Sequence, residues 1–196
     1  MAFQHHLTCK MFLNTRLYFT AIVTVSIWTL LLWSHFHGGV PKHHLLANEQ
    51  LPAISNWWGG LLLPLLTWFL LYRIQIRIKQ QVTQGHDGSG YLKQIFYGFA
   101  CSMGFGIVLS IFFTFGQPDI CGYMMLALLP LGLLIPIYRA ECLLGFVFGM
   151  TFTFGTVLPT GIGAILVLVG ALLYLVIRSG ILFIVSKVVR KPLPDR

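Results

Sequence analysis

The sequence predicts an all-α, polytopic membrane protein, a bundle of six transmembrane helices with both termini in the cytoplasm. The first observation is composition: 57% of residues are apolar, 9% are charged, and the mean hydropathy is +0.81. A soluble domain carries about 25% charged residues. The second is a series of apolar runs of roughly 20 residues, the length that crosses a bilayer as a helix. We therefore expect one transmembrane domain over residues 1–196.

Six apolar segments are expected to be the spans. The first is longer than the apolar region of a cleaved signal peptide, so we expect it to be retained. After the second, "RIQIRIKQQ" alternates like a strand. A continued helix is favoured, because Arg73 and Arg77 then share one face, as do Ile74 and Ile78. The predicted spans are about 17–37, 57–78, 91–115, 120–138, 142–158 and 162–186.

Prolines and short polar segments predict the boundaries. Pro130 and Pro136 are expected to kink the fourth span, because each removes a backbone donor and crowds the preceding turn. A turn at 159–161 is expected to separate the fifth span from the sixth. The segment 179–190 either extends the sixth helix, with Arg178 reaching the membrane interface, or lies along the inner interface as an amphipathic segment, and extension is favoured.

The distribution of positive charge is the third observation, and it predicts the orientation. Of the 13 Lys and Arg residues, all but Lys42 fall on the side of the two termini. The positive-inside rule makes that side cytoplasmic and favours an even number of spans. The net charge of +8 is then explained by contact with anionic membrane lipids. Nucleic acid is not an expected partner, because no recognition motif accompanies these residues. The expected location is the cell membrane, which in a prokaryote is the inner membrane.

Small residues four apart predict close helix packing. Gly145 and Gly149 form a GxxxG spacing in the fifth span. Ala100 with Gly104, and Ser102 with Gly106, repeat that spacing in the third span. Packing inside the bundle is favoured over a homo-oligomer interface, because multispan proteins use such pairs internally.

The outer connection, residues 35–56, is the predicted functional region. The segment "HFHGGVPKHH" holds four of the seven histidines, interrupted by two glycines and a proline that let the chain fold back. Imidazole binds Zn, Cu, Ni or Fe, and a carboxylate can complete the ligand set. The candidate metal ligands are His35, His37, His43, His44 and Glu49. Asn48, Asn56, Trp57 and Trp58 are the candidate substrate-binding residues.

Three functions are compatible with this region. One is a metal-dependent enzyme at the outer interface, acting with one transition metal on a lipid-like or isoprenoid-like substrate. Another is an uncoupled channel or solute facilitator with the loop as its outer mouth. The last is a non-catalytic membrane subunit or assembly factor. Histidine and tryptophan also gather at membrane interfaces with no metal present, so plain interfacial packing stays open. Proton-driven transport is disfavoured, because away from their ends the predicted spans contain no Asp, Glu, Lys, Arg or His apart from Arg178, which lies near the inner boundary.

Overall fold

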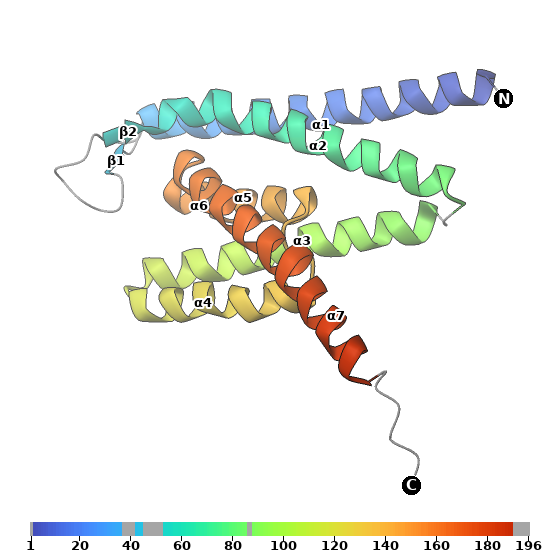
Figure 1. Ribbon diagram of the computed structural model, residues 1–196. Helices are drawn as coiled ribbons and strands as arrows, with labels where there is room; N and C mark the ends of the chain where they lie inside the picture. Colours follow the sequence, from blue (N-terminus) through green and yellow to red (C-terminus); the bar gives the residue numbers. More distant parts are fainter. Residues whose placement is uncertain (1, 37–41, 45–52, 86–87, 190–196) are drawn as a thin grey trace, which may run out of the picture.

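The computed structural model describes the backbone of residues 2–36, 42–44, 53–85 and 88–189, and the side chains of 13–36, 57–85, 88–183 and 185–187. Helices form almost all of this part of the chain (Figure 1). They are α1 (Ala2–Phe36), the short 3-10 turn η2 (Asn56–Trp58), α2 (Gly59–Thr83), α3 (Gly88–Thr114), α4 (Pro118–Leu134), α5 (Ala140–Phe154), α6 (Val157–Ala171), the π-helical segment η3 (Leu172–Ile177) and α7 (Arg178–Val189). The prediction of an all-helical architecture is confirmed for these residues.

Four segments are long and apolar enough to cross a membrane: Leu13–Phe36, Gly59–Thr83, Gly88–Thr114 and Val157–Lys187. The last of these joins α6, η3 and α7, so the predicted extension of the sixth helix is observed. α4 has 17 residues and α5 has 15. At 1.5 Å per residue they reach only about 25 Å and 22 Å, against a hydrocarbon core of about 30 Å.

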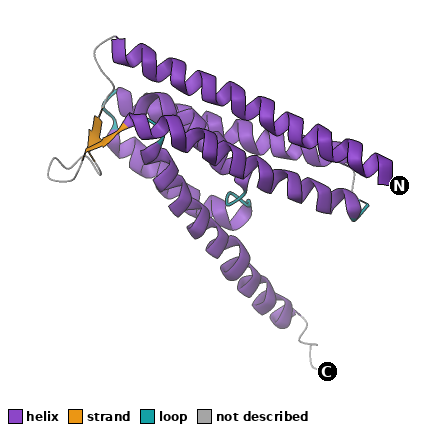
Figure 2. Ribbon diagram, turned by 90° about the horizontal axis from the view of Figure 1, so that it is seen from above, coloured by secondary structure: helices purple, strands orange, loops and turns teal. Residues whose placement is uncertain are grey.

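The helices are arranged around α5. α1 and α2 run side by side as one antiparallel pair, α3 and α4 form a second pair, and α6 to α7 crosses the bundle obliquely (Figures 1 and 2). α5 packs against α2, α3 and α6 and is the most buried helix, with Leu144, Val147 and Met150 in its core face. The start of α1 and the end of α7 both lie away from the end that carries the strand pair.

Two helix boundaries differ from the expected ones. α4 stops at Leu134, four residues before the predicted end, and Pro136 terminates the helix where a kink was expected. The cause is Ile135, which precedes the proline and is extended (φ −119°, ψ 141°), as steric contact with a following proline favours. The α5–α6 break falls at Gly155 (φ 70°, ψ −171°), a backbone conformation open essentially to glycine alone. Pro159 lies inside the first turn of α6, where a missing N–H leaves no helical bond unmade.

The second helix continues as expected: α2 runs without interruption to Thr83, and Ile74 and Ile78 are both buried. The connection between α1 and α2 holds a feature that was not predicted. Lys42–His44 (β1) pairs antiparallel with Ala53–Ser55 (β2), with His43 opposite Ile54.

Candidate functional site

The α3–α5 contact fixes the position of the central helix. A Cβ atom added to Gly145 would collide with the carbonyl oxygen of Phe99, and one added to Gly149 would collide with that of Met103. From the other side, a Cβ on Gly106 would come within 2.9 Å of the Phe146 carbonyl oxygen. The two backbones therefore touch, as the glycine spacing in α5 suggested. Gly104, the α3 residue selected from the sequence, has nothing within 4 Å of its Cβ position and lies off this contact.

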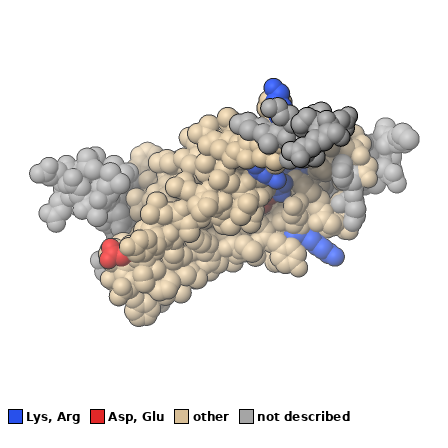
Figure 3. Space-filling view, turned by 60° about the horizontal axis from the view of Figure 1, so that its bottom comes forward, with Lys and Arg blue, Asp and Glu red and all other residues tan. Residues whose placement is uncertain are grey.

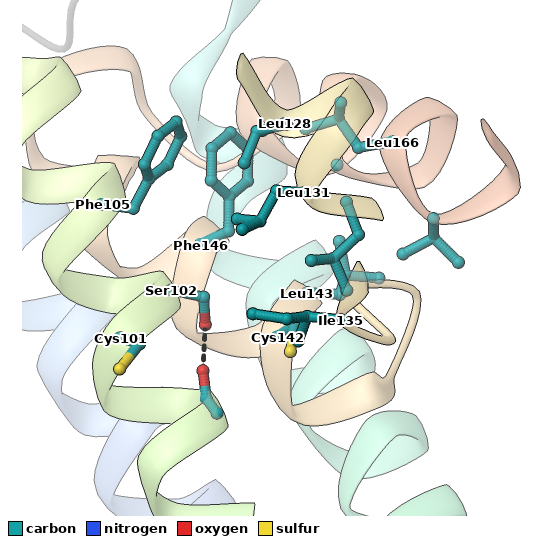
Figure 4. A pocket seen from close by; sticks show the side chains of 14 residues that line it. Cys101, Ser102, Phe105, Leu128, Leu131, Ile135, Cys142, Leu143, Phe146 and Leu166 are labelled. Atoms are coloured by element: carbon teal, nitrogen blue, oxygen red, sulfur yellow. Dashed lines mark hydrogen bonds between the residues drawn. The ribbon is translucent and has the colours of Figure 1, made fainter. Parts of the chain in front are cut away.

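Beside this contact lies an apolar cavity of about 250 Å³ (Figure 4). Four helices enclose it, because α3 and α5 touch while α4 and α6 stand farther off on the same side. Its lining residues are Gly98, Cys101, Ser102 and Phe105 from α3; Leu128 and Leu131 from α4; Ile135 and Ile137 from the α4–α5 turn; Cys142, Leu143 and Phe146 from α5; and Gly163, Leu166 and Val167 from α6.

The lining offers almost no polar group to a ligand. The hydroxyl of Ser102 donates to the carbonyl oxygen of Gly98 in its own helix, at 2.7 Å (Figure 4). The remaining polar side chains are the thiols of Cys101 and Cys142. Cys101, Leu131 and Ile135 are themselves exposed, so the cavity opens between α3 and α4. We call these three residues the mouth. A ligand would enter the cavity through the mouth, between α3 and α4, from the side of the helix bundle.

The α4–α5 turn, residues 135–139, closes one end of the cavity. The amide of Ile137 donates to the carbonyl oxygen of Ile135 at 2.8 Å. The side chain of Ile137 lies against Gly132 and Gly170, whose added Cβ atoms would be 3.3 Å and 2.9 Å from it. The ring of Tyr138 lies 5.7 Å from that of Tyr174 in η3. Short π-helical segments of this kind are frequent at functional sites.

A buried ion pair lies directly behind the same end. Glu141 is only 1% exposed, and Arg77 Nη2 donates to both of its carboxylate oxygens, at 2.8 Å and 2.6 Å. Arg139 Nη1 lies 4.0 Å from Glu141 Oε1. Gly98 separates this group from the cavity, because a Cβ on Gly98 would be 3.2 Å from Glu141 Cγ and 3.6 Å from Cys142 Sγ.

Neither the cavity nor the ion pair was predicted from the sequence. Arg77 was counted only for orientation, and Glu141 was assigned to a turn. One signal was available: the acidic residues number five, and Glu141 stands two residues from Arg139 at the start of an apolar run. That signal indicates that Glu141 is paired with a cation, but it does not indicate that the cation is Arg77.

The site residues predicted between positions 35 and 58 are described only in part. His35 is exposed, and its ring lies 5.4 Å from that of Phe36 and 6.0 Å from that of Trp57. Trp57 and Trp58 are 40% and 65% exposed. The side chains of His37, His43, His44, Asn48, Glu49 and Asn56 lie outside the described residues. Within the described residues no three His, Cys, Asp or Glu side chains are grouped to hold a metal. The predicted metal site therefore stays a prediction.

Comparison of the chain with protein-family models gave no match, and neither the curated proteins nor the solved structures gave a significant one.

Proposed function

We propose that this multi-pass membrane protein binds the apolar chain of a lipid-like molecule in the cavity between α3, α4, α5 and α6. The observation that carries the proposal is a cavity of about 250 Å³ with an almost wholly apolar lining. A smaller apolar cavity, of about 150 Å³, stays dry in a soluble protein and takes up benzene. The space here therefore suits several methylene groups of a hydrocarbon chain.

The apolar side chains around the cavity lose packing contacts where no atoms fill it. Water is a poor occupant, because a buried water needs two to four polar partners and the Ser102 hydroxyl is already bonded. A hydrocarbon chain fills the space without leaving a polar group unpaired.

We also propose a topology of six crossings with the arginine-rich end in the cytoplasm. Four arginines lie toward one end of the bundle, each held by a contact of its own. Arg16 stacks on Trp68 at 3.8 Å, and Arg77 and Arg139 both approach Glu141. Arg178 lies over Tyr174, beside the α4–α5 turn. The positive-inside rule then orients the bundle. α5 is short for a crossing, but its neighbours cover it, so little of the mismatch meets lipid.

Of the other functions open from the sequence, conduction through this cavity has the least support. A permeating ion needs polar groups to replace its hydration shell, and the described lining offers one hydroxyl and two thiols. The outer metal site and an assembly role remain separate hypotheses, since neither depends on the cavity.

Filling the cavity tests the proposal. Val167 lines it, whereas Leu168, the next residue of α6, is 72% exposed and faces away. The full chain is purified in a mild detergent, and lipid retained per chain is measured by native mass spectrometry. We expect Val167→Phe to lose the bound lipid and Leu168→Phe to keep it. If Val167→Phe lowers the melting temperature, Leu131→Phe at the mouth replaces it. Equal lipid retention in the filled and control variants would refute the proposal.

A further inference from the structure

Charge near the mouth carries an inference about the headgroup of the ligand, and it rests on the proposed lipid-binding function. Cys101, Tyr97 and Lys93 follow one another at intervals of four on α3, so they share one face of that helix. Tyr97 is 66% exposed, and Lys93 is exposed as well. Eight residues of helix place the Cα of Lys93 about 12 Å from that of Cys101 along α3. Lys93 therefore lies beyond the mouth, on the side where the headgroup of a lipid would lie if its chain entered there.

Arg139 supplies positive charge at the α4–α5 turn, next to residues that line the cavity. It stands two residues after Ile137 and three before Cys142, and both of those residues line the cavity. Its carboxylate neighbour is already engaged: Glu141 accepts bonds of 2.6 Å and 2.8 Å from Arg77, while Arg139 stays at 4.0 Å. Two arginines thus share one carboxylate, so the group formed by Arg77, Arg139 and Glu141 keeps one net positive charge.

Few acidic side chains stand near these cations in the part of the chain that the structure describes. Among the described residues the carboxylates are Asp119, in the turn at the far end of α3, and the buried Glu141. No described carboxylate lies within 4.0 Å of Lys93. Figure 3, which brings the lower side of Figure 1 forward, shows red at one end of this face and blue toward the other.

We propose that the cavity selects an anionic lipid, whose chain enters through the mouth while its phosphate or carboxylate headgroup lies between Lys93 and Arg139. A neutral lipid could fill the same cavity but would leave the two cations without an anion. The ligand chemistry is thus a single negative headgroup joined to a hydrocarbon chain. It could come from a membrane phospholipid or from a free fatty acid.

The test compares anionic with neutral lipids on the purified full chain. Native mass spectrometry measures binding of dioleoyl phosphatidylglycerol against dioleoyl phosphatidylcholine, and of oleate against monoolein. The first pair reports on phospholipid and the second on fatty acid. A cation near an anionic headgroup contributes about fivefold in affinity. We therefore expect Lys93→Gln to reduce the anionic preference about fivefold and Lys93→Gln with Arg139→Gln to reduce it about 25-fold.

Two variants serve as controls. Lys93→Arg keeps the charge and should keep the preference. Lys187→Gln removes a cation that lies over Phe183 on α7, away from the mouth, and should leave the preference unchanged. Because Lys93 is exposed on a helix surface, its variants test the idea even if Arg139→Gln fails to fold.

The outcomes separate the two proposals. If Lys93→Gln and the double variant leave the anionic preference unchanged while Val167→Phe still abolishes binding, the headgroup assignment is wrong and the cavity function stands. If Val167→Phe binds every lipid as the wild type does, the cavity function itself is wrong. Preference for phosphatidylglycerol alone identifies a phospholipid, and preference for oleate alone identifies a fatty acid; each agrees with an anionic headgroup.

Discussion

Arg77 of α2 and Glu141 of α5 are joined by one guanidinium nitrogen, Nη2, which donates to both carboxylate oxygens at 2.8 Å and 2.6 Å. The carboxylate is 2% exposed and the guanidinium side chain 28% exposed. The pair links two helices that are 64 residues apart in the chain. It is therefore a tertiary contact of α5 at the arginine-rich end of the bundle.

Removing one partner should be more harmful than removing both. A buried charge left without its partner typically costs about 3–5 kcal/mol, whereas an apolar replacement of both partners is often nearly neutral. We expect Arg77→Met and Glu141→Leu to lower the melting temperature strongly when made singly, and the double variant to recover much of the loss. Thermal unfolding in detergent followed by size exclusion measures this, with exposed Arg73→Met as the control. Additive losses in the double variant would show that the two side chains do not act as a pair.

The two predicted packing glycines of α5 can be compared with the one in α3. Gly149→Leu should destabilise the bundle, because the added side chain would meet the Met103 carbonyl and the Gly106 Cα, the latter 3.1 Å from the Cβ position. Gly104→Leu is the matched control, since its Cβ would meet nothing within 4 Å. Melting temperature and oligomer mass are the measurements. A loss of stability in Gly104→Leu alone would mean that α3 uses its other face for packing.

The predicted outer metal site is testable by elemental analysis. Protein purified without a metal-affinity tag should carry close to one Zn, Cu, Ni or Fe per chain, because several imidazoles and Glu49 lie close together in the sequence. His37→Ala with His43→Ala should remove the metal and leave the melting temperature little changed. His5→Ala with His6→Ala, near the other end of α1, is the control. A wild-type protein that is free of metal and cannot be loaded would overturn the metal hypothesis.

The proposed orientation is testable with fusion reporters. Reporters placed near residues 45, 87 and 196 should report outside, cytoplasm and cytoplasm, respectively, because only Lys42 lies on the expected outer side. A cytoplasmic signal from position 45 would reverse the assignment.

The helices were predictable because their signal is local. Apolar runs, turn residues and the spacing of Ile74 and Ile78 each depend on neighbours a few residues away. The end of α4 was missed although its cause, Ile135 before Pro136, is also local, because a proline inside an apolar run either kinks a helix or ends it.

The cavity and the ion pair beside it were not predictable, because they depend on which helix faces pack against one another. Gly104 and Gly106 belong to the same kind of small-residue pattern, yet they are two residues apart and so about 200° apart around α3. Only Gly106 reaches α5. The pairing of Arg77 with Glu141 depends on how α2 and α5 pack, and the cavity depends on how far α4 and α6 stand from the α3–α5 contact. No local pattern records these distances.

The shortness of α5 has a consequence for biogenesis. A segment of 15 residues that begins next to a carboxylate is a poor independent substrate for membrane insertion. Its ion-pair partner Arg77 and the glycine-matched surface of α3 both precede it in the chain, so they are synthesised first. The contacts of α5 with α2 and α3 are therefore made with helices that precede it in the chain, whereas its contact with α6 is made with a helix that follows.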